Sequence, residues 1–162
     1  MSNLGIRTEV LKNFQIFEGL ASRDLESVAE VLKLQAIKTG IPLIKREAQD
    51  GQIFFIVDGE VRVEMIGTDG KTSEILTTLS AGDTVGELAL VRVGRRSASA
   101  VAAKDSVIYS VTESVLNALL DKHPTIGLRI FRNLSKILAT RLLDTNLLVQ
   151  KKSLSLALLR SM

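Results

Sequence analysis

Apolar residues recur every three or four positions at the two ends of the chain, and this spacing is typical of helices. Residues 4–34 are predicted to be helical, with a helix start at Ser22. The same spacing returns from Thr112, and Pro124, which the first turn of a helix tolerates, begins a long helix. One stripe of this helix could pack against the rest of the chain or pair with its copy in a second subunit; it consists of Ile130, Leu134, Ile137, Arg141, Thr145 and Leu148.

The middle of the chain alternates apolar and polar residues and predicts short strands. They are expected at 42–46, 53–58, 60–66, 72–79, 99–103 and 106–111. Thr68-Asp69-Gly70-Lys71 predicts a hairpin turn, because glycine accepts the positive φ of tight turns, and Gly82-Asp83 predicts another turn. Strands at this spacing favour an antiparallel barrel or jelly roll.

The expected fold class is therefore mixed α+β. An antiparallel β-barrel or jelly roll (a double-stranded β-helix) would occupy residues 36–111, flanked by N-terminal helices over 1–35 and C-terminal helices over 112–162. The sequence has no internal repeat and no linker rich in proline or glycine. We therefore expect a single domain over residues 1–162.

Composition narrows the chemistry. The chain has no cysteine and a single histidine, His123, which excludes disulfides, thiol catalysis and a site with several histidine ligands. We therefore expect no metal. The net charge of +3 is too small to indicate nucleic-acid binding by itself. Neither a signal peptide nor an apolar run of membrane-spanning length is present, which predicts a cytoplasmic protein without a membrane span.

The segment from Gly86 to Ser99 has the composition of an anion site. A glycine leads into a short turn of Glu, Leu and Ala, and the first N–H groups of such a turn lack internal partners. Arg96 lies ten residues further on, and its guanidinium can hold two phosphate oxygens at once. Glu87 fits such a site if it accepts hydrogen bonds from hydroxyls. The other interpretation is a surface ion pair between Glu87 and Arg96.

This segment resembles the phosphate-binding cassette of cyclic nucleotide-binding domains, whose pattern is approximately G-E-L-A-L, a spacer, then R-x-A-T/S. The chain has GELAL, a spacer and RSAS, with AGD before the cassette and FFIVDGEVRV over residues 54–63. One departure is Glu47, near a turn where the family usually has glycine.

The resemblance implies a role for each matching position. Glu87 would hold the ribose 2′-hydroxyl and Arg96 the cyclic phosphate. Phosphate and sugar contacts would be completed by backbone at Gly86, Leu88 and Ala89 and by the Ser97 hydroxyl, and the base would lie against Val63, Thr77 and Leu79. Arg92 and Arg95 are expected to be solvated.

Residues 134–142 resemble the dimer helix of catabolite-activator-like regulators, which implies a homodimer through the 124–150 helix. Arg141 and Thr145 would then close over the base, and Asn146 stands where a partner subunit's hydroxyl usually reaches it. A buried polar trio needs partners, which the base or an interhelical contact that sets register could supply. A helix-turn-helix follows this helix in those regulators, but residues 147–162 are too few for one, so we expect no direct DNA binding.

The leucine-rich tail over residues 147–162 could be an extra helix packed on the domain or its dimer mate, a surface for a partner protein, or a membrane contact.

Three functions can be compared with these features. The first is a non-enzymatic sensor that binds cAMP, or cGMP, as a regulatory ligand and signals to an unknown effector protein. A cyclic dinucleotide is an alternative ligand for such a sensor. The second function is the ligand-sensing half of a transcription regulator. The third, a cupin-type enzyme, needs several histidines, which this chain lacks.

Overall fold

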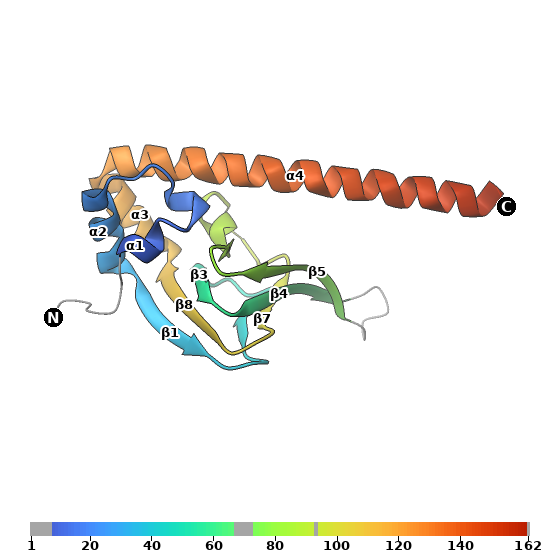
Figure 1. The fold of residues 1–162 in the computed structure, drawn as a ribbon, viewed down its shortest axis with the longest axis horizontal. Coiled ribbons are helices and arrows are strands. Elements are labelled where there is room, and N and C mark those ends of the chain that lie inside the picture. Colours follow the sequence, from blue (N-terminus) through green and yellow to red (C-terminus); the bar gives the residue numbers. More distant parts are fainter. Residues whose placement is uncertain (1–7, 67–72, 93, 162) are drawn as a thin grey trace.

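The computed structural model describes residues 8–66, 73–92 and 94–161. Helices occupy both ends of this range and strands the middle (Figure 1). The helices are α1 (Thr8–Leu11), the 3-10 helix η1 (Gln15–Phe17), α2 (Ser22–Val31), the 3-10 helix η2 (Glu87–Leu90), α3 (Glu113–Lys122) and α4 (Pro124–Ser161). The strands are β1 (Lys33–Ile37), β2 (Pro42–Ile44), β3 (Gln52–Asp58), β4 (Glu60–Ile66), β5 (Ser73–Ser80), β6 (Thr84–Val85), β7 (Ser99–Ala102) and β8 (Ser106–Thr112).

The strands form two four-stranded antiparallel sheets. One has the order β1-β8-β3-β6 and the other β2-β7-β4-β5. A buried cluster of residues from both sheets, among them Phe54 and Ile108 of the first and Val61 and Ala100 of the second, fills the space between them. The mixed α+β prediction is confirmed. The strand pairing over the described residues makes two facing sheets and not one closed barrel, so the jelly-roll alternative applies.

Two strands were missed by the sequence pattern. Residues 33–37, the first two of which lie within the predicted helical region 4–34, form β1, because they pair with β8 from Lys33↔Ser110 to Ile37↔Ser106. That pairing joins residues far apart in the chain, so local spacing does not reveal it. β6 has only two residues, too few for a visible alternation. The turn at 82–83 is present, with Asp83 N–H donating to Ser80 O at 3.0 Å. The predicted hairpin turn at 68–71 lies outside the described residues.

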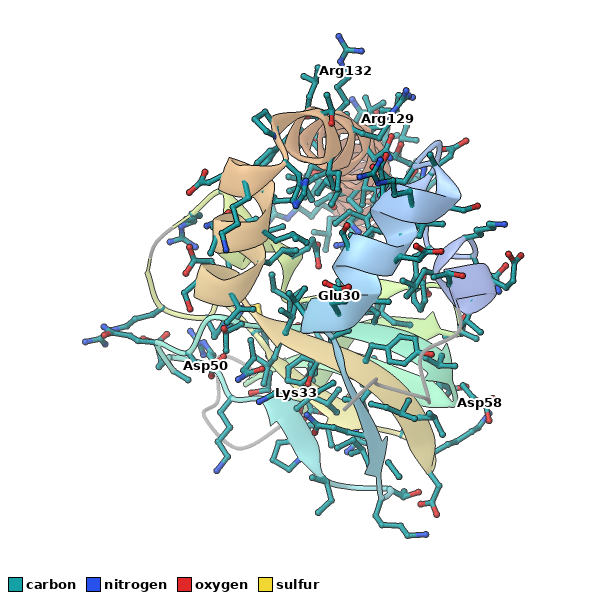
Figure 2. The ribbon with its side chains drawn as sticks, turned by 90° about the vertical axis from the view of Figure 1, so that its left-hand side faces the viewer. Glu30, Lys33, Asp50, Asp58, Arg129 and Arg132 are labelled. Carbon is teal, nitrogen blue, oxygen red and sulfur yellow. The ribbon has the colours of Figure 1, made fainter. Side chains whose placement is uncertain are left out.

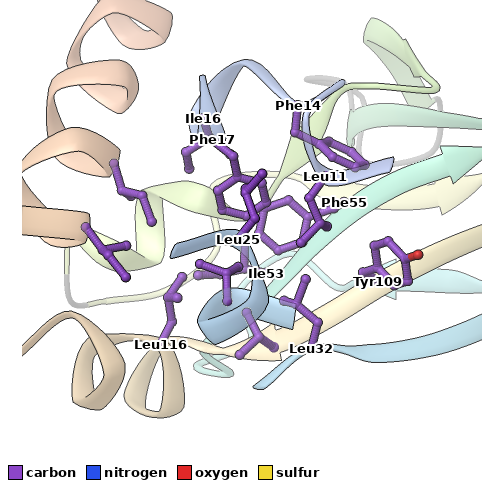
Figure 3. Close-up of a cluster of buried hydrophobic side chains, with 14 of the residues drawn as sticks. Leu11, Phe14, Ile16, Phe17, Leu25, Leu32, Ile53, Phe55, Tyr109 and Leu116 are labelled. Carbon is purple, nitrogen blue, oxygen red and sulfur yellow. The ribbon is translucent and has the colours of Figure 1, made fainter. Parts of the chain in front are cut away.

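The helices cover one face of the β1-β8-β3-β6 sheet. Phe14 and Phe17 pack on Phe55 of β3, with ring centroids 5.6 Å and 5.0 Å away (Figure 3). Successive side chains of a strand point to opposite faces. Ile53 and Phe55 therefore join the helix-side core, whereas Phe54 and Ile56 join the core between the sheets. β3 is apolar on both sides for this reason.

The first half of α4 packs on its own chain. Ile130, Leu134 and Ile137 are buried in the helix-side core. Packing against the rest of the chain is therefore confirmed for these three residues of the stripe, which are not free to form a dimer seam, whereas Arg141, Thr145 and Leu148 are exposed. Arg132 projects from the side of α4 that faces away from the strands (Figure 2), whereas the guanidinium of Arg129 lies beside Gly19.

The C-terminal end of α4 extends beyond the body of the domain (Figure 1). Every residue from Arg141 to Arg160 is exposed. The prediction of an extra helix that packs on the same domain is wrong, because the tail continues α4 without a break. Over the described residues, none of the helices is long and apolar enough to cross a membrane.

Candidate ligand-binding site

A cavity of about 520 Å³ lies between the cassette, strands β4 and β5, and α4. A volume of this size is in the range of small-molecule sites. The structure brings most of the predicted site residues to its wall: Gly86, Glu87, Leu88, Ala89, Arg96, Ser97, Val63, Thr77, Leu79, Arg141 and Thr145. Asn146 is exposed on α4 and is not part of this wall.

Gly86 makes the turn that places the cassette. It has φ +86° and is the N-cap of η2. A Cβ at this position would lie 2.5 Å from the carbonyl oxygen of Gln52 and 3.1 Å from Ile44 Cδ1. Only glycine satisfies both the left-handed backbone and the close approach to β3. The predicted short helical turn after this glycine is confirmed as η2.

Glu87 is a buried carboxylate. Its side chain is 3% exposed, and Oε1 accepts a hydrogen bond from Nη1 of Arg141. Its second oxygen, Oε2, is buried and has no hydrogen-bond partner among the described residues. A buried charge without full hydrogen bonding is costly, so such an atom in a cavity wall marks a place for a donor from a ligand.

Arg141 connects α4 to the cassette. Besides Glu87, its guanidinium donates to the carbonyl oxygen of Thr84 at 3.2 Å. The hydroxyl of Thr145 donates to Arg141 O at 2.8 Å, one turn back along the helix. In the single chain, Arg141, Thr145 and Asn146 are all exposed on α4, and their contact with a base or with a second helix stays a prediction.

Arg96 is held by three groups of the protein. Its Nη2 donates to Asp50 Oδ1 at 2.7 Å and to Gln52 O at 2.6 Å. Nε donates to Asp50 Oδ1 at 3.2 Å, and Nη1 donates to Gly86 O at 3.3 Å. The alternative of an ion pair between Glu87 and Arg96 is wrong, since each has a different partner.

The sequence did not single out Asp50. Its pairing with Arg96 spans 46 positions, and no local pattern marks it. Arg92 and Arg95 are exposed as expected, yet they also line the cavity, as do Glu113, Asp144 and Leu148, which the sequence analysis did not select. Glu47, where the family usually has glycine, adopts φ +68°, a left-handed backbone that explains why glycine is usual there.

The fold and this cavity define a binding module of the cyclic nucleotide class, and sequence comparison agrees. The profile of the cyclic nucleotide-binding domain matches residues 34–123, which include all eight strands of the structure except the first residue of β1. The chain belongs to the cyclic nucleotide-binding domain family.

Several proteins with this domain are similar to the chain. The Pycsar effector protein BcPycTIR of Burkholderia cepacia is 30% identical over 148 residues, which cover 91% of this chain and 45% of that protein. The cyclic AMP receptor protein of Thermus thermophilus is 26% identical over 137 residues, covering 85% of this chain and 61% of that protein. The crystal structure of the Thermus thermophilus catabolite activator protein superposes with a TM-score of 0.74 at 26% identity, over 86% of this chain and 63% of that one.

These relatives are longer than the region they share with this chain. The chain spans less than half of BcPycTIR and of the related Pycsar effector proteins of Pseudomonas aeruginosa and Xanthomonas perforans, at 45%, 36% and 37% of their lengths. What the comparisons share is therefore the binding domain.

The close packing at Gly86 yields a first prediction. Gly86→Ala should lower the free energy of unfolding by about 2–5 kcal/mol, because left-handed strain adds to overpacking against β3. Gly40→Ala is the matched control, since Gly40 has φ +83° but nothing lies within 4 Å of the point that its Cβ would occupy. It should lose only the strain, about 1–2 kcal/mol. Urea unfolding of both variants measures the difference, and equal losses would contradict the packing argument.

Proposed function

We propose that the chain is a cyclic nucleotide sensor whose ligand lies in the cavity between the cassette and α4. The observation that carries this proposal is the buried Oε2 of Glu87, which has no hydrogen-bond partner among the described residues. Arg96 lines the same cavity. Glu87 and Arg96 would together bind a small molecule that carries a hydroxyl donor close to an anion. The sugar phosphate of a cyclic nucleotide has both.

The roles of the remaining residues follow from this placement. Glu87 accepts from the ribose 2′-hydroxyl, and Arg96 takes the cyclic phosphate with help from Ser97 and the cassette backbone. Arg141 and Thr145 lie on the α4 side of the ligand. The base lies against residues on the strand side of the cavity. These are the apolar side chains of Val63, Leu79 and Val85, together with Thr77.

We favour cAMP as the ligand. A cyclic AMP receptor protein is among the proteins most similar in sequence over most of this chain. A cGMP or cyclic-dinucleotide sensor, and the ligand-sensing half of a transcription regulator, are the alternative functions. We assign the chain no catalytic step, and the cytoplasmic location stays a prediction.

The contact between Glu87 and Arg141 supports coupling to α4. One carboxylate holds α4 through Oε1 and offers Oε2 to the ligand. A ligand hydroxyl that donates to Oε2 would weaken the negative charge of the carboxylate that binds Arg141. The ligand would therefore bind with different affinity when α4 is in different positions, and binding would shift α4 between them. The output of the sensor would be a rearrangement of α4 that an effector protein detects.

Binding and the role of Arg96 are tested together by calorimetry with cAMP and cGMP. The wild-type chain should bind at least one of them saturably. Arg96→Leu should weaken that binding by about 2–5 kcal/mol, because the phosphate charge loses its partner. Arg95→Leu is the matched control. The Arg95 side chain is next to Arg96 in the sequence, is 66% exposed and pairs with Glu47. No heat and no thermal shift with either nucleotide would disprove the proposed function, and equal effects of the two variants would disprove the assignment of Arg96.

The role of Glu87 is tested with 2′-deoxy-cAMP. For the wild-type chain, removal of the 2′-hydroxyl should weaken binding by roughly 10- to 100-fold, as expected for a hydrogen bond to a charged group. In Glu87→Ala the two ligands should bind with nearly the same affinity, because the acceptor is gone. If the preference for the ribonucleotide survived in Glu87→Ala, the hydroxyl would be bound elsewhere.

We also propose that the chain forms a homodimer through α4. Leu128, Leu142, Val149 and Leu156 are separated by multiples of seven residues, and each is more than half exposed. A seven-residue repeat places side chains along one side of a helix, which is the pattern of a coiled-coil seam. Asn146 falls on the same side, where a polar residue sets register.

A double variant tests this seam. Leu142→Glu with Val149→Glu should convert the dimer to a monomer in light scattering, because the repeated carboxylates would face each other. Leu147→Glu is the control, since Leu147 is comparably exposed but lies on the opposite side of α4 from Val149. A monomeric wild-type chain, or dissociation by Leu147→Glu alone, would refute this seam.

A further inference from the structure

The guanidinium of Arg96 is almost fully used by the protein itself. An arginine has five N–H donors. Hydrogen bonds to Asp50, Gln52 O and Gly86 O take four of them: Nε and one Nη2 hydrogen go to Asp50, the other Nη2 hydrogen to Gln52, and one Nη1 hydrogen to Gly86. The side chain of Arg96 is only 9% exposed.

Both edges of the guanidinium that could hold a phosphate are therefore engaged. Bidentate binding uses two neighbouring N–H groups. The edge formed by Nε and Nη2 is on Asp50, and the edge formed by Nη1 and Nη2 is on two backbone carbonyls. Those carbonyls are fixed, because Gln52 begins β3 and Gly86 is the N-cap of η2.

Asp50 is the group that can leave. Its side chain is 38% exposed and lies in the loop before β3. The backbone of this loop is pinned to Arg96, since Glu47 N–H donates to Arg96 O and Arg96 N–H donates to Ala48 O, both at 3.0 Å. A side-chain rotation of Asp50 toward solvent, which also gives up the 3.3 Å hydrogen bond that Gln52 N–H donates to Asp50 Oδ1, would free the Nε–Nη2 edge with no movement of the backbone.

We propose that Asp50 is a resident anion that competes with the ligand's phosphate for Arg96 and thereby sets the affinity of the site. This inference rests on the proposed function, which assigns the phosphate to Arg96. A carboxylate and a phosphate carry charge of the same sign, so they repel each other at one guanidinium. Binding then exchanges one anion for another, and the measured affinity is lower than the phosphate contact alone would give.

The test is the affinity of Asp50→Asn and Asp50→Ala for cAMP, or for cGMP if that is the nucleotide that binds, by calorimetry. Both variants should bind about 5- to 50-fold more tightly than the wild type, because the competing charge-assisted contact is removed. If Asp50 instead holds Arg96 in position for the phosphate, both variants bind more weakly. Unchanged or weaker binding overturns the proposal.

Two controls remove a negative charge from side chains that do not contact the guanidinium of Arg96. Glu47→Gln lies in the same loop and pairs with Arg95 at 3.3 Å. Asp58→Asn lies at the other end of β3, on the opposite side of the strands from Asp50 (Figure 2). Each should change the affinity by less than about 3-fold, as expected for exposed charges. A gain equal to that of the Asp50 variants would show a general charge effect and overturn the proposal.

A second readout separates this proposal from the proposed function. Inorganic phosphate, compared with chloride at equal ionic strength, should raise the melting temperature of Asp50→Asn more than that of the wild type, because the freed guanidinium binds anions. If no cyclic nucleotide binds any variant but phosphate stabilises Asp50→Asn selectively, the proposed function fails and the role of Asp50 stands. If nucleotides bind and neither readout favours Asp50→Asn, only the role of Asp50 fails.

Discussion

Glu87 carries a negative charge in a place that is almost completely removed from water, and a charge so placed has to be balanced by a nearby cation. The cation is Arg141, which comes from α4, 54 residues further along the chain. This ion pair connects three parts of the molecule: the cassette, the edge strand β6 through Thr84 O, and α4. The cavity has its shape because these three parts meet at that pair.

Arg96 and Arg141, which both line the cavity, are held in different ways. Arg141 contacts a buried carboxylate and is itself partly exposed, whereas the side chain of Arg96 is only 9% exposed and contacts a carboxylate that is partly exposed. In the proposed function, the ligand adds a donor beside the first pair and replaces the acidic partner of the second. A sugar hydroxyl and a phosphate would thus act on two separate ion pairs, and only the first of them includes α4. In that proposal, the binding of the sugar, and not that of the phosphate, would be the step closest to α4.

α4 serves both the core and the surface. Its first half is part of the hydrophobic core through Ile126, Ile130, Leu134 and Ile137. Beyond Arg141 it is apolar on several sides and exposed. A helix with so much apolar surface is stable when another surface covers it. The proposed dimer would cover one side, and the remaining apolar side chains would be available to the proposed effector.

The sequence by itself determined the elements whose signals are local. The glycine that begins η2, the proline that begins α4 and the alternation in β3 each reflect the backbone or burial needs of neighbouring residues. The cassette spacing from Gly86 to Arg96 likewise selected residues that the structure brings to one cavity wall. Local patterns were enough for these features because each depends on residues within a turn, a strand or a short loop.

Only the tertiary structure decided which groups pair across the site and which face of α4 is buried. Spacing by threes and fours is the same whether a stripe packs on its own sheet or on a second chain, so the sequence left that choice open for Ile130, Leu134 and Ile137. β1 escaped detection because its partner is β8, at the other end of the sheet region. The contacts Glu87–Arg141 and Asp50–Arg96 join side chains 54 and 46 positions apart. Such pairs depend on how the two sheets and α4 are packed together, and no local pattern of residues encodes that arrangement.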